Sequence, residues 1–273
     1  MADLAVSLLV LAGIVLACEV ARRASARLLS GGVYGACAVE LISTLQLCAC
    51  THELKLLGDA GVSQRPPVLA LALTYGTSVV HALTSCGATC NPSGACERFF
   101  RERGGGLSAG TRVAALMARV TCQFAAAVAA RAAVRSVWAR GLSDLHTRHR
   151  ASAFRCASPI GHAPLLEAAA VEMACAFVVH AAASCTRSLQ EKYRVHAVAA
   201  VITSAVYAGG STTGAVFNPA LAFSTQFPCT GGTFAEYSLV YWMGPLLALP
   251  EPPWAWNSPE LHRLLLESSS TPP

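Results

Sequence analysis

Long apolar stretches separated by short polar connectors dominate the chain. They run over residues 4–20, 34–51, 67–87, 113–138, 164–186, 195–209 and 237–249. Most of them are near the roughly 20 residues that a membrane-crossing helix needs, and the last is clearly shorter. Polar connectors lie at 52–66, 139–163 and 187–194. The pattern predicts an all-α membrane protein.

Composition agrees with this fold class. Charged residues make up 13% of the 273 residues and hydrophobic residues 54%, against a charged share of roughly 25% in soluble domains. So much apolar surface is untypical of a soluble enzyme and of a disordered chain. The net charge of +5 is modest, and the arginines lie between apolar stretches, so we expect the lipid bilayer and no nucleic acid as a partner.

The two ends of the chain differ from the rest. Asp3 precedes the first apolar stretch, whereas Arg22, Arg23 and Arg27 follow it, and this polarity is wrong for a cleaved signal peptide. We therefore predict an anchor or an interfacial helix over residues 1–30. The Pro- and Ser-rich residues 250–273 predict a disordered tail.

Basic residues give a prediction of orientation, because they favour the cytoplasmic side of a membrane. Successive crossings place three basic clusters on one side: Arg22, Arg23 and Arg27; Arg98, Arg101 and Arg103; Arg187, Lys192 and Arg194. The connector 139–163, which also carries arginines, falls on the opposite side and disagrees with the rule.

An internal repeat links the two halves of the chain, about 31–138 and 164–249. Gly-Ala-x-x-Asn-Pro ends at Asn91-Pro92 in the first half and at Asn218-Pro219 in the second. Glu40 and Glu172 lie in apolar stretches, 51 and 46 residues before the respective Asn. Matching Gly/Pro-interrupted segments are typical of inverted-repeat transport proteins. The alternative is two unrelated loop turns.

Each Asn-Pro pair predicts the start of a short helix. Asn caps by accepting a backbone N–H, and Pro suits the first helical position. Half-helices over 92–102 and 219–227 that enter from opposite faces would meet N-terminus to N-terminus, where their dipoles repel cations. With the Asn oxygens used in capping, free NH₂ donors would point into the gap. This arrangement suits a neutral solute such as water.

The remaining polar residues of the apolar stretches have structural interpretations. An acid inside a membrane helix is usually functional or paired, so we favour this for Glu40 and Glu172 over helix-end acids in the interface. Arg119 and Gln123, four apart on one helix face, are expected to face protein or to snorkel rather than to line a pore. His81, His180 and His196 are expected to be interior or boundary groups, since they have no metal-ligand spacing.

The chemistry of an enzyme has no support in the sequence. No G-x-S-x-G motif occurs around a candidate serine, and we expect no cofactor, no metal and no catalytic residue. The 12 cysteines are scattered, which favours small buried residues over a disulfide framework. For Cys229 we favour a packing role over redox sensing.

Three sequence blocks carry a family resemblance: Leu45–Leu57, Arg194–Ala222 and Tyr241–Pro245. With the paired Asn-Pro motifs they resemble the aquaporin family, in its unorthodox intracellular branch, over about residues 30–248. The resemblance implies six membrane helices, two pore half-helices, a homotetramer, and conduction of water and sometimes glycerol or hydrogen peroxide. It also implies residence in the endoplasmic reticulum. Residues 1–30 would then be an extra apolar segment.

The resemblance also assigns roles to residues. The pore signature is Asn91, Pro92 and Ser93 with Asn218, Pro219 and Ala220; the selectivity filter is Leu71, Val206 and Leu221; Glu40 and Glu172 are buried acids that support the half-helix loops. Ser93 replaces the family's usual Ala and places a hydroxyl near the constriction. Val206 and Leu221 replace the His and Arg of water-selective members, so the filter would be wider and uncharged.

The last helix departs most from the family. Pro250 limits the final apolar stretch to 237–249, about 20 Å of helix against a hydrocarbon core of about 30 Å. A non-conducting subunit that regulates or impairs the assembly of full-length channels is therefore the alternative to a passive pore. A coupled transporter ranks third, because its ion site would need more intramembrane acids than two.

Overall fold

A bundle of long helices surrounds two short ones. The computed structural model describes residues 2–29, 32–59, 68–102 and 108–248. Its long helices are α1 (Ala2–Leu28), α2 (Gly32–Asp59), α3 (Val68–Thr84), α5 (Ala109–Trp138), α7 (Leu165–Cys185) and α8 (Glu191–Thr213). All of these except the 17-residue α3 are long and apolar enough to cross a membrane. The chain is thus a multi-pass, all-α membrane protein, as the apolar pattern predicts.

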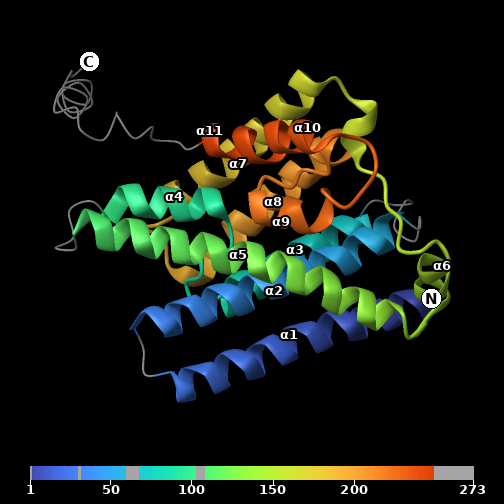
Figure 1. The fold of residues 1–273 in the computed structure, drawn as a ribbon, viewed down its shortest axis with the longest axis horizontal. Coiled ribbons are helices and arrows are strands. Elements are labelled where there is room, and N and C mark those ends of the chain that lie inside the picture. The colour runs from blue at the N-terminus through green and yellow to red at the C-terminus, as the bar shows by residue number, and fades with distance from the viewer. Residues whose placement is uncertain (1, 30–31, 60–67, 103–107, 249–273) are drawn as a thin grey trace.

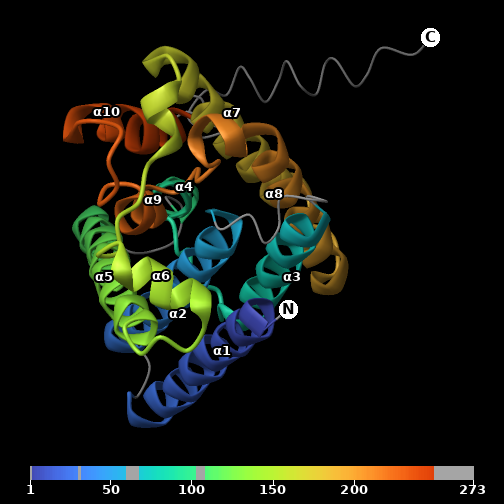
Figure 2. The ribbon, with the colours of Figure 1, turned by 90° about the vertical axis from the view of Figure 1, so that its right-hand side faces the viewer.

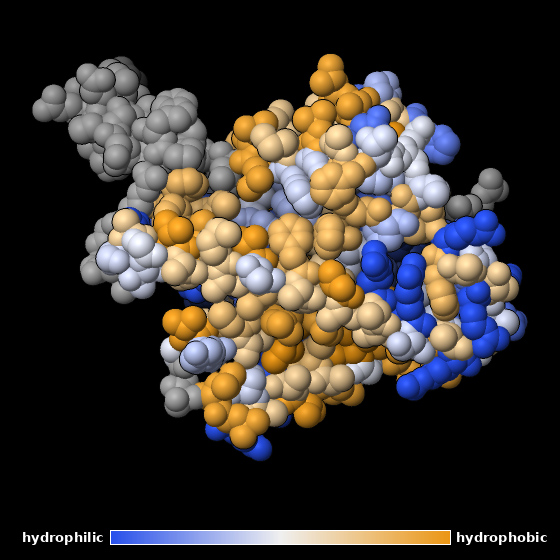
Figure 3. Space-filling view, viewed as in Figure 1, coloured by the Kyte–Doolittle hydropathy of each residue, from blue (hydrophilic) through white to orange (hydrophobic). Residues whose placement is uncertain are grey.

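The two Asn-Pro motifs start the two short helices, α4 (Pro92–Arg101) and α9 (Pro219–Thr225). Figure 2 shows both near the centre of the bundle, with the long helices around them and α1 outside this ring. On the face that Figure 3 shows, apolar side chains cover most of the middle, and hydrophilic ones gather at the end near α6 (Asp144–Ala151). This distribution is that of a chain whose middle faces lipid.

Helix α1 runs along α2 in the opposite direction rather than across the end of the bundle (Figure 1). Near its start, Ser7 Oγ donates to Glu53 Oε1 at 2.5 Å. Near its end, the buried Arg22 donates to Gln46 Oε1 at 2.9 Å and pairs with Glu19 at 3.1 Å. Helix α1 is long and apolar enough to cross a membrane; whether residues 1–30 form a crossing anchor or an interfacial helix stays a prediction.

The final helical segment is short and irregular. It consists of α10 (Phe234–Ser238), a π-helical turn η3 (Leu239–Met243) and α11 (Gly244–Leu247). Tyr241, which is fully buried, donates from its hydroxyl to Thr213 O at 2.6 Å. A Cβ at Gly244 would lie 3.1 Å from Ala169 O, so glycine allows the close packing of this segment against α7. The predicted tail 250–273 lies outside the described residues.

The two ends of the bundle carry different side chains. At one end, Glu97 of α4 lies 3.0 Å from His180 Nδ1, and its carboxylate also pairs with Arg101 and Arg187. At the opposite end lie the N-terminus, α6 and the rest of the 139–163 connector (Figure 1). The connector and the basic α7–α8 turn are thus on opposite faces, as the alternation of crossings predicts.

Candidate functional site

The candidate site lies where α4 and α9 begin. Asn91 Oδ1 accepts the N–H of Ser93 at 3.0 Å, and Pro92 occupies the first helical turn. In the second motif, Asn218 Oδ1 accepts the N–H groups of Ala220 at 3.1 Å and Leu221 at 3.2 Å. Both asparagines cap their helices as the motif predicts.

The two caps are joined to each other across the centre. Asn91 Nδ2 donates to Phe217 O at 3.2 Å, and Asn218 Nδ2 donates to Cys90 O at 2.8 Å. Each acceptor is the residue just before the other asparagine, so the pair of bonds repeats with two-fold symmetry. The prediction of entirely free NH₂ groups is therefore wrong, because one hydrogen of each amide holds the opposite loop.

Glu40 of α2 binds the loop that precedes Asn91. Its carboxylate is 1% exposed and accepts from Thr89 N at 3.2 Å, Thr89 Oγ1 at 2.8 Å and Cys90 N at 2.6 Å. Gln123 Nε2 adds a bond of 2.7 Å to the same acid, and Arg119 Nη1 lies 3.4 Å from it. Arg119 and Gln123 thus face protein, as their spacing predicts, and surround the acid with donors.

Glu172 of α7 does the same for the second loop. It is fully buried and accepts from Thr213 Oγ1 at 2.5 Å, Val216 N at 2.9 Å and Phe217 N at 2.5 Å. Both acids therefore bind the backbone N–H of the residue immediately before an asparagine. A buried carboxylate needs such donors to offset its lost hydration.

The backbone of both loops is held in a conformation that L-residues avoid. Cys90 and Phe217, at matching positions, have φ of 53° and 38°. Left-handed conformations cost about 1–3 kcal/mol at such residues and persist where the surroundings enforce them. Gly87 and Gly214, each four residues before its asparagine, have φ of 77° and 85°. The carboxylates accept the N–H groups of Cys90 and Phe217, which helps to offset this strain, and the carbonyls of the same two residues accept from the asparagines.

The other predicted site residues occupy distinct elements. Ser93 is fully buried in α4, and its Oγ has no hydrogen-bond partner in the described chain. Leu71 is a half-buried residue of α3, Val206 packs against the buried cluster that contains Ala205, and Leu221 is 9% exposed in α9. Their role in a filter stays a prediction.

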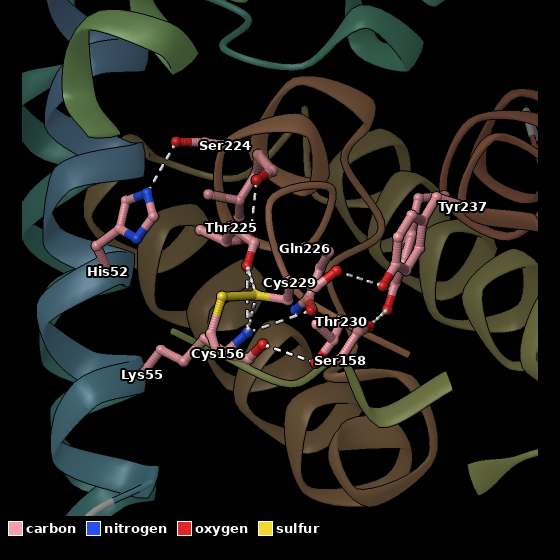
Figure 4. Close-up of a disulfide and its surroundings, with 12 residues drawn as sticks. His52, Lys55, Cys156, Ser158, Ser224, Thr225, Gln226, Cys229, Thr230 and Tyr237 are labelled. Atoms are coloured by element: carbon pink, nitrogen blue, oxygen red, sulfur yellow. Dashed lines mark hydrogen bonds between the residues drawn. A yellow bond between two sulfur atoms is a disulfide. The ribbon is translucent and has the colours of Figure 1, made fainter. Parts of the chain in front are cut away.

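Sequence reasoning missed a polar cluster on α2 that holds the far end of α9. His52 Nε2 lies 3.0 Å from Ser224 Oγ, and Lys55 Nζ donates to Thr225 O and Gln226 Oε1, both at 3.2 Å (Figure 4). Glu53, between them in sequence, accepts from Trp138 Nε1 at 2.7 Å and lies 3.0 Å from His146 Nε2. The only sequence signal was an unusual run of polar residues within the block Leu45–Leu57.

A disulfide joins Cys156 to Cys229, 73 residues apart (Figure 4). Two short contacts lie beside it: Ser158 N donates to Thr230 O at 2.7 Å, and Gly161 approaches Gly231 so closely that a Cβ would lie 2.9 Å from it. The interpretation of the cysteines as packing residues is wrong for this pair, since Cys229 ties the end of the α9 loop to the 139–163 connector. Spacing alone could not identify its partner.

We expect the Cys156→Ala/Cys229→Ala variant to lose about 2–5 kcal/mol of stability, because the bridge restrains a long loop in the unfolded chain. A lower midpoint of thermal unfolding in detergent measures this loss. Cys185→Ala, which removes an exposed free cysteine, is the control and should match the native chain. An unchanged midpoint in the double variant would contradict a stabilising bridge. So would a reductant that lowers the midpoints of the native chain and of the double variant by the same amount.

Comparison with known proteins agrees with the paired half-helices. The chain is 38% identical over 249 residues to aquaporin-11 of Homo sapiens, covering 90% of this chain and 87% of that protein. It is 39% identical over 213 residues to aquaporin-11 of Equus caballus, covering 77% of this chain and 73% of that protein. It is 35% identical over 251 residues to aquaporin-12 of Mus musculus, covering 91% of this chain and 84% of that protein. No protein-family model matches.

A membrane bundle in which two capped half-helices face each other defines a channel-type fold, and these similarities define its family. The chain belongs to the aquaporin family.

Proposed function

We propose that this protein is a passive channel for water and small neutral solutes, and that its pore runs between Asn91 and Asn218. The reciprocal amide–carbonyl bonds between the two loops carry the proposal, because they hold both helix starts at one point. The second hydrogen of each amide is then the donor for a passing solute. Two positive helix ends at the same point disfavour cations.

Buried acids support this pore rather than taking part in transport. The carboxylates of Glu40 and Glu172 accept hydrogen bonds from the loop backbone. These bonds fix the position of both asparagines. An acid that moves ions would need access to solvent along the path. This favours a passive channel over a coupled transporter.

The filter residues that the resemblance assigns would make a permissive entrance. Leu71, Val206 and Leu221 are aliphatic, so they add neither a charge barrier nor a fixed donor. We propose that glycerol or hydrogen peroxide pass with little disadvantage relative to water. Stopped-flow measurements on proteoliposomes with water, glycerol and peroxide gradients test both the pore and its selectivity.

We expect Leu221→Arg to suppress glycerol flux more than water flux, because the guanidinium narrows the entrance and adds donors that water can satisfy. The ratio of the two permeabilities, from the same proteoliposomes, is the measurement. Leu166→Arg, at an exposed position in the first turn of α7, controls for an added charge. An equal loss of water and glycerol flux in Leu221→Arg would contradict the filter assignment.

Orientation and cellular location are part of the proposal. Disulfides persist in oxidising compartments, so the Cys156–Cys229 end would face the lumen or the exterior and the Glu97 end the cytoplasm. We propose residence in the endoplasmic reticulum and assembly as a homotetramer, both from the family resemblance. The second candidate, a non-conducting subunit, is favoured by the short segment Phe234–Leu247; flux equal to that of empty liposomes would select it.

A further inference from the structure

A pocket with an excess of positive charge lies beside the disulfide, on the side of α9 that faces α2 and α5. Its walls include Lys55 and Asp59 of α2, Arg131 and Arg135 of α5, and the aromatic residues Trp138 and Phe154. None of these belongs to the pore signature or to the assigned filter. The named wall residues are thus different from the residues assigned to the proposed pore.

The charges in this pocket are not balanced within the described chain. Arg131 and Arg135 lie one helical turn apart, and like charges at this spacing repel each other. Neither arginine forms an ion pair in the part of the chain that the structure describes, although the Arg135 guanidinium lies 5.8 Å from the ring centre of Phe154. Asp59 is the acid among the lining residues. The lining therefore carries more positive than negative charge.

Lys55 is held so that its charge cannot leave the pocket. Its ammonium donates to Thr225 O and Gln226 Oε1 and lies 3.7 Å from Cys229 Sγ (Figure 4). These are neutral acceptors, and Asp59, one helical turn further along α2, is the acid whose charge acts on Lys55. One acid among three cations leaves the lining with an excess of positive charge. Burial, and after it the charge of Arg135, lowers the pKa of the His149 imidazole at the rim, and that ring adds little charge.

The depth of the pocket fits the headgroup region of a bilayer. Helix α5 has 30 residues, about 45 Å, which is close to the full thickness of a bilayer with its polar layers. Arg135, three residues before the last residue Trp138, lies about 5 Å from that end of the helix. The polar layers add about 5–8 Å to each side of the hydrocarbon core. Arginine binds phosphate oxygens through a planar pair of N–H donors, and lysine adds a point charge.

We propose that this pocket binds a phosphate group between Lys55, Arg131 and Arg135, supplied by an anionic phospholipid headgroup or by a free phosphate anion. Bound there, the anion would bridge α2, α5 and the end of α9. It would stabilise the disulfide end of the second half-helix without entering the pore. The proposal does not depend on conduction.

The test compares the full chain with two matched variants. Arg131→Gln/Arg135→Gln removes both guanidinium groups from the pocket, and Arg140→Gln removes an exposed arginine outside it. In lipid-free neutral detergent, inorganic phosphate is titrated against chloride at equal ionic strength while the thermal midpoint is followed. In nanodiscs, phosphatidylcholine alone is compared with mixtures that contain increasing phosphatidylglycerol.

The native chain and Arg140→Gln should be stabilised by phosphate or by phosphatidylglycerol, and the double variant should need about tenfold more of the same probe, because charged hydrogen bonds are lost. A response to inorganic phosphate identifies the free anion, and a response confined to phosphatidylglycerol identifies the headgroup. No stabilisation of the native chain by either probe, or an equal response of the double variant and Arg140→Gln, would overturn the proposal.

If the double variant does not fold, the single variants Arg131→Gln and Arg135→Gln replace it in the same titrations. Each should weaken the apparent affinity about threefold or more, since one of the three charged donor groups is lost. Affinities equal to that of Arg140→Gln in both single variants would overturn the site.

Discussion

Replacing Asn218 with aspartate is expected to abolish solute flux. Asn218 Oδ1 accepts two N–H groups of α9, while Nδ2 donates to Cys90 O at 2.8 Å. A carboxylate keeps the first interaction but turns the second into an oxygen–oxygen contact. It also places a charge at the centre of the membrane, at a cost of at least about 2.5 kcal/mol. Both effects separate the loops and remove the donor for the solute.

Proteoliposomes with equal amounts of inserted protein measure this loss as the specific water permeability. Gln190→Glu is the matched control, since it makes the same amide-to-acid change at the exposed N-cap of α8, where a carboxylate is favourable. Its permeability should equal that of the native chain. Native permeability in Asn218→Asp at normal membrane abundance would contradict the pore between the two asparagines.

Those features of the site that repeat within the sequence could be predicted from it. The apolar stretches located the crossings, and the Asn-Pro pairs located the starts of α4 and α9, because capping is a local property of a few consecutive residues. The register of Glu40 and Glu172 relative to the asparagines marked both acids as buried and paired. Their acceptance of loop N–H groups follows from that placement.

Contacts between distant segments could not be predicted in this way. The disulfide joins residues 73 apart, and Lys55 reaches Thr225 over 170 positions. No periodicity encodes which of the other eleven cysteines meets Cys229, because the packing of the 139–163 connector against the segment after α9 decides it. The reciprocal amide bonds were missed for the same reason, since each depends on the position of the opposite loop.

The short final segment leads to the second large expected effect. Helical residues run from Phe234 to Leu247, about 21 Å at 1.5 Å per residue, against a hydrocarbon core of about 30 Å. The sequence continues with Pro250, Pro252 and Pro253, which cannot donate the backbone hydrogen bonds of a longer helix. We therefore expect the last carbonyls of this segment to lie near hydrocarbon without helical partners, at several kcal/mol each. This cost is comparable to the net stability of a whole domain.

We therefore expect the native chain to be retained in the endoplasmic reticulum, to turn over rapidly and to conduct poorly unless it assembles with full-length partners. Replacing Pro250, Glu251, Pro252 and Pro253 with leucine should lengthen its half-life in a pulse-chase and raise its specific permeability in proteoliposomes, because the helix can then reach the far interface. Ala substitutions at Ser268, Ser269 and Ser270 serve as the control and should change neither quantity. The short helix would prove harmless if the leucine variant had the same half-life and the same permeability as the native chain, since the exposed carbonyls would then be satisfied without a longer helix.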